Sequence, residues 1–237
     1  MASGVLSASR RMTAAGSRRW SRLGVVRSLF GAGGKEGGDG KQAKRTPKIR
    51  IDNLADMSEL RRTGGKQWQA SDSVTSAEVS PLFPSLSGVT LSGHPTTLPG
   101  NLLGNVSLVS VFMRDYGKSL CEKYSRPYMV SFGQQPDTAV FELSLIDMWM
   151  YRLMSKWMTR NLAKTMSPDN HDYFMLHSGK DVPEIRETLQ LRNSMIGYVF
   201  LLDREGRIRW KAHASPTEYE IESLLRCSQQ LLEEERH

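Results

Sequence analysis

Cysteine has the greatest potential for chemistry in this sequence, which has two, Cys121 and Cys227. They lie far apart and form no CxxC pair, so a disulfide scaffold and a cysteine-based zinc site are excluded. A nucleophilic cysteine must be a thiolate, stabilised by a helix N-terminus and nearby cations. Cys121 follows a predicted strand ending at Phe112 by about nine residues and has Lys118 nearby, but the adjacent Glu122 disfavours a thiolate.

Other catalytic patterns are weak. The histidines are scattered and nowhere spaced as metal ligands on one helix: His94, His171, His177, His213 and His237. We expect His213 on the surface. The stretch "GKSL" at Gly117 resembles the end of a phosphate-binding loop but lacks the earlier glycine. We therefore predict no catalytic residue, no metal and no cofactor.

These residues must be positioned by the surrounding elements, and the clearest is "GYVFLLDREGRIRWKAHASP", which predicts a hairpin. Tyr198 to Leu202 is a short apolar run typical of a buried strand. Asp203 and Gly206 supply turn chemistry, because the Asp side chain accepts backbone N–H groups and Gly tolerates positive φ. Ile208 and Trp210 alternate with charged residues in the second strand.

The remaining pattern predicts further strands at Val106–Met113 and Val140–Ile146, a loop and short helix between them, and a helix at Met148–Met166. Asp181 would cap the next helix, and Ser215 the last one. The order strand, helix, strand, helix, hairpin, helix is α/β. We predict a thioredoxin-like (peroxiredoxin-like) mixed sheet flanked by helices, with a disordered N-terminal extension.

The predicted helix "MWMYRLMSKWMTRNLAKTM" has two different sides. Methionines and Leu162 occupy one side, which predicts a core face and leaves the basic side to solvent. The alternative is that the basic side, with its tryptophans, meets a membrane surface or a partner. This basic side comprises Trp149, Arg152, Lys156, Trp157, Arg160 and Lys164.

The chain has 237 residues and a net charge of +7, and this charge is unevenly distributed. Residues 1–35 carry seven basic residues and no acid, whereas the remainder is neutral. An Arg-rich, Ser-rich, acid-free leader predicts an organelle transit peptide, which we take to be mitochondrial, with a disordered basic tail as the alternative. A neutral body lacks the field that gathers phosphate backbones, which argues against nucleic acid and weakens an RNA- or ribosome-associated role.

Three regions follow from these patterns. Residues 1–35 are the predicted transit peptide, residues 36–80 a mostly disordered linker, and residues 81–237 a thioredoxin-like domain. Nowhere is there a run of about 18 apolar residues that could span a bilayer, so we expect a soluble or peripheral protein. Two cysteines without a pairing pattern suit a reducing compartment.

The C-terminal half resembles the mitochondrial ATPase complex subunit ten family, over roughly residues 81–232. The specific parts are "N-x3-GYVFLLD" and "IRW", followed by "SPTEYE". The chain departs from the family pattern after Trp210, where Lys211 to Ala214 stand in place of small residues and glycine. The matching motif residues are Asn193, Gly197, Tyr198, Asp203, Ile208, Arg209 and Trp210.

The resemblance implies a thioredoxin-like domain without redox activity, peripheral on the matrix side of the mitochondrial inner membrane. It implies a non-enzymatic assembly factor for the proton-transporting ATP synthase, a chaperone for membrane subunit a (subunit 6) as it joins the rotor ring. The family offers no catalytic residues to transfer. The alternative from the residues themselves is a one-cysteine thiol peroxidase using Cys121.

Overall fold

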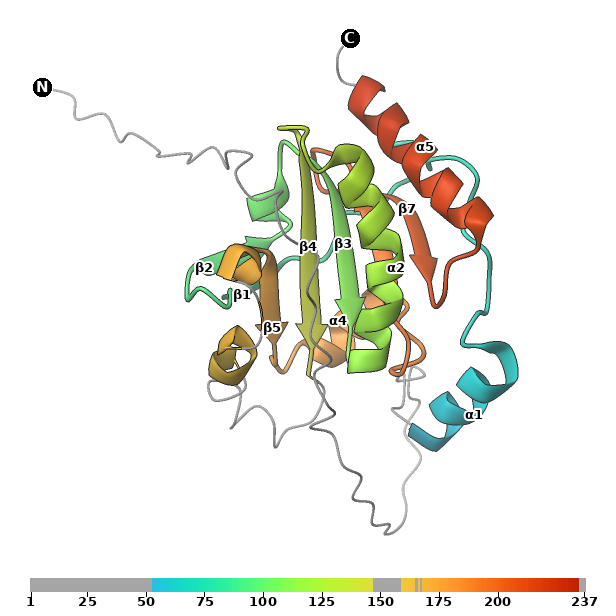
Figure 1. The fold of residues 1–237 in the computed structure, drawn as a ribbon, viewed down its shortest axis with the longest axis vertical. Helices are drawn as coiled ribbons and strands as arrows, with labels where there is room; N and C mark the ends of the chain where they lie inside the picture. Colours follow the sequence, from blue (N-terminus) through green and yellow to red (C-terminus); the bar gives the residue numbers. More distant parts are fainter. Residues whose placement is uncertain (1–52, 147–158, 165, 167, 235–237) are drawn as a thin grey trace, which may run out of the picture.

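A five-stranded mixed sheet forms the centre of the molecule. The computed structural model describes residues 53–146, 159–164, 166 and 168–234 (Figure 1). The strand order is β5-β4-β3-β6-β7, with β3, β4 and β5 parallel and β6 and β7 antiparallel to their neighbours. The strands are β3 (Val106–Phe112), β4 (Thr138–Leu145), β5 (Phe174–His177), β6 (Tyr198–Leu202) and β7 (Ile208–His213).

This strand order is thioredoxin-like, which confirms the predicted fold class. A parallel β-α-β unit is built from β3, helix α2 (Asp115–Phe132) and β4. The β6-β7 hairpin and helix α5 (Glu218–Glu234) complete the same sheet. β3 and β6 lie in the middle and are buried along their whole length, which explains their unbroken apolar runs.

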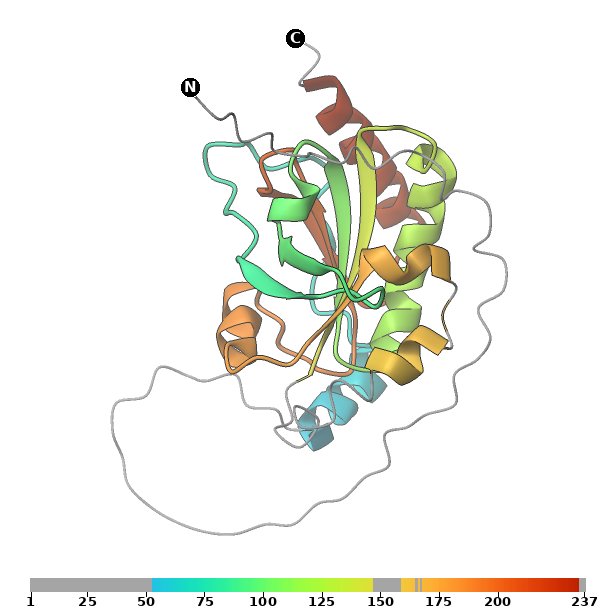
Figure 2. The same ribbon diagram turned by 90° about the vertical axis from the view of Figure 1, so that its left-hand side faces the viewer.

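Helices cover both faces of the sheet, as Figure 2 shows. On one face α2 and α5 pack around a core that contains Tyr124, Tyr128 and Leu224. On the other face lie helix α4 (Val182–Thr188) and a small two-stranded sheet, β1 (Leu86–Val89) with β2 (Pro95–Leu98). Two short 3-10 helices, η1 (Gly100–Leu102) and η2 (Pro168–Tyr173), connect these elements. Among the described helices, none combines the length and apolar character needed to cross a bilayer.

The predicted hairpin and its turn are confirmed. The predicted alternation of the second strand is wrong at Arg209, which is buried at 5% exposure, and the pairing has a register shift between Leu201 and Leu202. Oδ1 of Asp203 accepts the N–H groups of Glu205 (3.1 Å) and Arg207 (2.9 Å), and Gly206 has a φ of +79°. Trp210 is buried at 2% exposure. The turn chemistry read from the sequence therefore sets the register of β6 against β7.

Other local predictions need correction. Helix α2 has 18 residues instead of being short. Asp181 makes no capping hydrogen bond; its carboxylate contacts His177 Nε2 at 2.9 Å instead. The cap of α5 is Thr217, not Ser215, because the Glu220 N–H donates to Thr217 Oγ1 (3.2 Å) and the Thr217 N–H donates to Glu220 Oε2 (3.0 Å). This reciprocal pair is a capping box two residues later than expected.

The segment before Pro81 packs on the domain. Helix α1 (Asn53–Thr63) leads into residues 64–81, which we call the strap; it runs along the β7 side of the sheet in Figure 1. The Thr75 N–H donates to Arg209 O (2.8 Å), and the Ile208 N–H donates to Pro81 O (2.8 Å). The strap therefore covers the open edge of β7, which would otherwise present unpaired backbone groups. Within the predicted linker, residues 53–80 thus belong to the folded unit.

We predict that Trp210→Ala lowers the free energy of unfolding by about 3 kcal/mol or more, because a buried indole is lost together with its hydrogen bonds. The Trp210 Nε1–H donates to Ser71 O (2.9 Å) on the strap and to Ser223 Oγ (3.1 Å) on α5. Denaturant unfolding measures the change. The control is Val130→Ala, at a side chain 87% exposed, where we expect a change below about 0.5 kcal/mol. Equal effects of the two substitutions would contradict the buried position of Trp210.

Candidate functional site

Cys121 lies inside the second turn of α2 and not at the helix N-terminus where a thiolate would be stabilised. Its side chain is 2% exposed, and Sγ lies 3.5 Å from Tyr198 O. Burial raises the pKa of the Cys121 thiol well above its ordinary value, and the Glu142 carboxylate raises it further. The geometry therefore keeps Cys121 protonated and out of reach of a substrate.

Two glycines bring the backbone close to this thiol. A Cβ on Gly197 would meet the Gly117 carbonyl oxygen and Cys121 Sγ, and a Cβ on Gly117 would meet the Ile196 carbonyl. The loop before β6 thus lies directly against α2 and closes the space over Cys121. The close approach gives a physical reason for glycine at position 197, which the sequence resemblance marked without one.

Lys118, the cation that lies near Cys121 in the sequence, forms its contacts with other groups. Lys118 forms an ion pair with Glu142, which is buried on β4, and its ammonium lies over the rings of Phe112 (5.6 Å) and Phe174 (5.4 Å). A buried charge needs such a partner. Cys227 on α5 is also a buried free thiol, and burial raises its pKa as well.

The expectation for His213 is wrong, because this histidine is 1% exposed. Its ring lies between Trp68 (centroids 4.2 Å apart) and Tyr198 (6.0 Å). Nε2 accepts the Gln67 N–H at 2.9 Å, while Nδ1 has no partner in the described part of the chain. Burial, with the nearby Lys66 cation, lowers the pKa of His213 to about 4. The imidazole is therefore neutral at physiological pH.

Sequence reasoning missed the residues that hold the strap, above all Glu220. Its carboxylate is 0% exposed and accepts Lys66 Nζ at 2.5 Å and the Ala70 N–H at 2.9 Å. Burial alone would raise the pKa of Glu220, but these hydrogen bonds and that of the Thr217 N–H outweigh it and lower the pKa. Residues 51–80 show no apolar period, so no sequence pattern predicted their docking.

The motif residues meet the same N-terminal segment. The Asn193 side-chain amide donates to the Asp56 carbonyl (3.1 Å) and to Glu59 Oε2 (2.8 Å) on α1. Tyr198 supports this loop, because its hydroxyl accepts the Asn193 N–H at 2.8 Å. The sequence-derived motif is thus a set of structural contacts and not a set of reactive groups.

The charged part of the motif lies at the hairpin. Arg209 donates to Thr75 O (2.6 Å) on the strap, to Asp203 (3.2 Å) and to Glu234 (2.9 Å) on α5. Ile208 is partly buried beside the core. The Arg209 guanidinium therefore connects the strap, the hairpin turn and α5.

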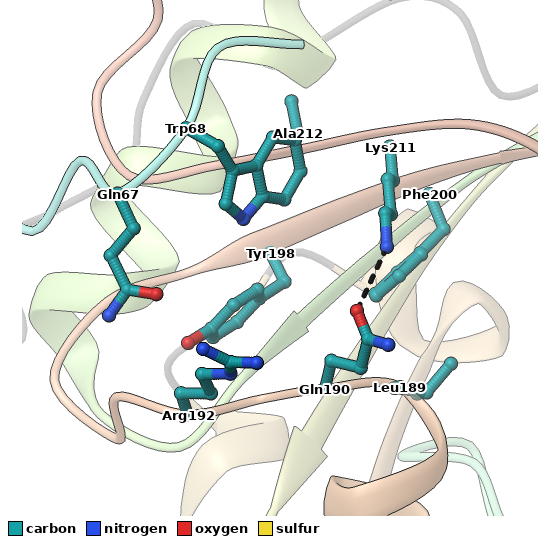
Figure 3. A pocket seen from close by; sticks show the side chains of 9 residues that line it. All are labelled: Gln67, Trp68, Leu189, Gln190, Arg192, Tyr198, Phe200, Lys211 and Ala212. Carbon is teal, nitrogen blue, oxygen red and sulfur yellow. Dashed lines mark hydrogen bonds between the residues drawn. The ribbon is translucent and has the colours of Figure 1, made fainter. Parts of the chain in front are cut away.

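Two adjoining pockets open between the strap, the sheet and the chain after α4. They have volumes of about 120 and about 440 Å³ and share Trp68, Leu189, Gln190, Phe200 and Lys211. Figure 3 shows the smaller one, with the Lys211 ammonium pointing at Gln190 and the Arg192 guanidinium lying beside Tyr198. Lys211 donates to Gln190 Oε1 at 3.2 Å and lies 5.5 Å from the Trp68 ring.

The predicted basic side of the 148–166 helix is only partly described. Trp149, Arg152, Lys156 and Trp157 lie outside the described residues. Arg160 and Lys164 are exposed in a helical segment, whereas Leu162, Ala163 and Met166 pack against the core beneath α2. Within the described residues no group of three His, Cys, Asp or Glu side chains could hold a metal ion.

Fold and cysteine geometry define a thioredoxin-like domain in which the cysteine nearest the usual reactive position is buried. The profile of the ATP10 protein family matches residues 27–231, and the chain belongs to this family, as the sequence resemblance predicted.

Two relatives illustrate the similarity. "Mitochondrial ATPase complex subunit ATP10" of Eremothecium gossypii is 29% identical over 178 residues, covering 73% of this chain and 65% of that protein. The Saccharomyces cerevisiae protein of the same name is 25% identical over 194 residues, which cover 75% of this chain and 69% of that protein. The chain thus spans just under two thirds of the Eremothecium protein.

Among solved structures, the chain is similar to the thioredoxin domain of a thiol-disulfide oxidoreductase from Bacteroides vulgatus. The identity is 17%, the match covers 64% of this chain and 95% of that chain, and the TM-score is 0.44. A putative protein disulfide isomerase from Bacteroides thetaiotaomicron is 18% identical. The match covers 67% of this chain and 93% of that chain, with a TM-score of 0.44. The fold assignment rests on the strand order described above.

We predict that Cys121 does not react with iodoacetamide in the folded protein at pH 7, because its thiol is buried and protonated. A Cys227→Ala background isolates the site, and mass spectrometry follows alkylation before and after unfolding. Labelling should be at least about 100-fold slower in the folded state. Rapid alkylation with a midpoint below pH 8 would support the thiol peroxidase instead.

The depressed pKa of His213 predicts a pH-dependent stability. An unfolded histidine titrates near pH 6.5 and the folded one near 4, so below pH 6.5 the unfolded chain takes up a proton that the folded chain does not. The free energy of unfolding should be constant above pH 7 and fall by up to about 2 kcal/mol by pH 5. Denaturant unfolding at each pH measures it.

The variant His213→Gln should lose this fall between pH 7 and 5, whatever its absolute stability. His94→Gln changes an exposed histidine and should keep the profile of the parent. A parent protein with a flat profile, or a His213→Gln protein with the parent's slope, would contradict the buried neutral imidazole.

Proposed function

We propose that this chain is a non-enzymatic assembly factor for the mitochondrial proton-transporting ATP synthase. The observation that carries the proposal is the ATP10 family match over residues 27–231. The names of the two relatives refer to the mitochondrial ATPase complex and support the same compartment and complex. The acid-free leader, residues 1–35, would direct import and be the transit peptide.

The geometry around Cys121 supports a role without thiol chemistry. The thiol is buried and its pKa is raised, and Lys118 is paired with Glu142. Motif residues that could have been reactive instead form hydrogen bonds to α1 and the strap. These contacts favour a binding protein over the peroxidase alternative.

We further propose a specific partner and a specific location for this chain. The chain would act peripherally on the matrix side of the inner membrane and assist subunit a (subunit 6) as it joins the rotor ring. The test is crosslinking in intact mitochondria followed by purification of this chain. Subunit a should be recovered above unrelated inner-membrane proteins, and loss of the chain should reduce intact ATP synthase on native gels. Normal assembly without the chain would contradict the proposal.

The basic side of the 148–166 helix is the proposed contact with the membrane surface. Arg160 and Lys164 are exposed while their helical neighbours pack on the core, which is compatible with an outward basic stripe. Each cation near an anionic leaflet contributes about 1 kcal/mol, so Arg152, Lys156, Arg160 and Lys164 together could supply a few. Trp149 and Trp157 would add interfacial contacts.

We predict that the triple variant Arg152→Glu, Lys156→Glu, Arg160→Glu binds cardiolipin-containing liposomes at least about 10-fold more weakly and impairs assembly, while the melting temperature is unchanged. Liposome flotation measures binding, which should also fall with added salt. A matched control is Arg61→Glu with Arg62→Glu, two exposed cations on α1. If the triple variant binds and supports assembly like the parent, the stripe is only a solvated face.

A further inference from the structure

The two adjoining pockets form one groove, which no sequence pattern predicted. Its walls come from the strap, from the end of α4 with the following chain, and from the sheet. The five shared residues make the two volumes continuous. Trp68 is 37% exposed, although tryptophan side chains are usually buried, and its indole is part of the wall common to both.

The two ends of the groove differ in chemistry. Pro81, Ile208 and Trp210 line the larger pocket alone, together with the uncharged polar residues Gln69, Ser71, Thr75 and Thr188. The smaller pocket adds Arg192, whereas Lys211, Leu189 and Phe200 line both pockets. Of the described residues that line either pocket, none carries a carboxylate. The groove thus has apolar side chains along its length, the Lys211 cation on the shared wall and a second cation, Arg192, at one end.

The two cations lack acidic partners in the part of the chain that the structure describes. Lys211 has the neutral Gln190 amide and the face of Trp68 as partners. Arg192 is exposed and makes no ion pair there. The Glu59 carboxylate on α1 already accepts Gln67 Nε2 (2.5 Å) and Asn193 Nδ2 (2.8 Å). A ligand carboxylate would therefore find two available donors, as charge complementarity requires.

We propose that this groove binds an extended peptide segment of a partner protein, in which an apolar or aromatic side chain precedes an acidic one. The apolar side chain would fill the larger pocket against Phe200 and Leu189. The carboxylate would lie between Lys211 and Arg192. Two neighbouring pockets of unlike chemistry match two side chains of one chain better than a single small anion. The inference rests on the groove itself and not on the assembly role proposed above.

The experiment uses fluorescein-labelled peptides Ser-Leu-Phe-Asp-Ser and Ser-Leu-Phe-Asn-Ser, blocked at both ends, and fluorescence anisotropy with the full chain. The Asp peptide should bind about tenfold more tightly than the Asn peptide, since a charge-assisted contact is lost. Binding of the Asp peptide should weaken with added salt. Equal affinities of the two peptides, or binding of neither, would overturn the proposal.

Substitution of each groove cation tests where the acidic side chain of the peptide binds. Lys211→Gln and Arg192→Gln should each weaken the Asp peptide by about three- to tenfold and leave the Asn peptide unchanged, as a double-mutant cycle requires. The matched control is Arg126→Gln, an exposed cation on α2 on the opposite face of the sheet. Thermal melting confirms that each variant is folded. If both groove variants bind the Asp peptide like the parent, the contact lies elsewhere and the proposal fails.

A competition experiment distinguishes a bound peptide from a small molecule that also has an apolar group and a carboxylate. Hexanoate, which joins an apolar chain to a carboxylate, is added as a competitor at equal concentration. It should displace the labelled Asp peptide at least about tenfold less well than the unlabelled peptide does. Equal displacement would show that the groove takes a small amphiphilic acid and would overturn the assignment to a peptide.

Discussion

The buried carboxylate of Glu220 is the interaction on which the arrangement of this domain depends. A carboxylate with 0% exposure is tolerated only when its oxygens are fully used. Here one oxygen accepts the Ala70 N–H, and the other accepts Lys66 Nζ and the Thr217 N–H. The same side chain thus completes the capping box of α5 and holds the strap, so the two segments are linked through one carboxylate.

The docked strap determines the environment of β7 and of the side chains beside it. It pairs with the edge of β7, covers Trp210 and encloses His213, whose pKa falls as a result. It also forms one wall of the groove, through Trp68 and its neighbours. A thioredoxin-like sheet without this segment would have an open edge and no groove on that side. The distinctive surface of this chain is therefore made by residues outside the βαβ and ββα core.

The sequence predicted the core of the fold and little of its periphery. The β6-β7 hairpin was predictable because Asp203 and Gly206 act locally, within a few residues. The strap was not, because its contacts with Glu220, Arg209 and Trp210 join positions more than a hundred residues apart and replace an apolar face with hydrogen bonds. For the same reason the structural role of the motif residues could not be predicted: Asn193 contacts α1 and Arg209 contacts the strap, which their spacing does not reveal.

Hydrogen exchange of the strap amides tests this account most directly. The N–H groups of Gln67, Ala70 and Thr75 each have an acceptor on the domain, so they should exchange about a thousandfold or more slowly than in an unstructured peptide. In Glu220→Gln their exchange should quicken selectively, while amides of β3 and β6 stay protected. Exchange of these three amides at the unstructured rate in the parent protein would contradict the docked strap and, with it, the groove that the strap encloses.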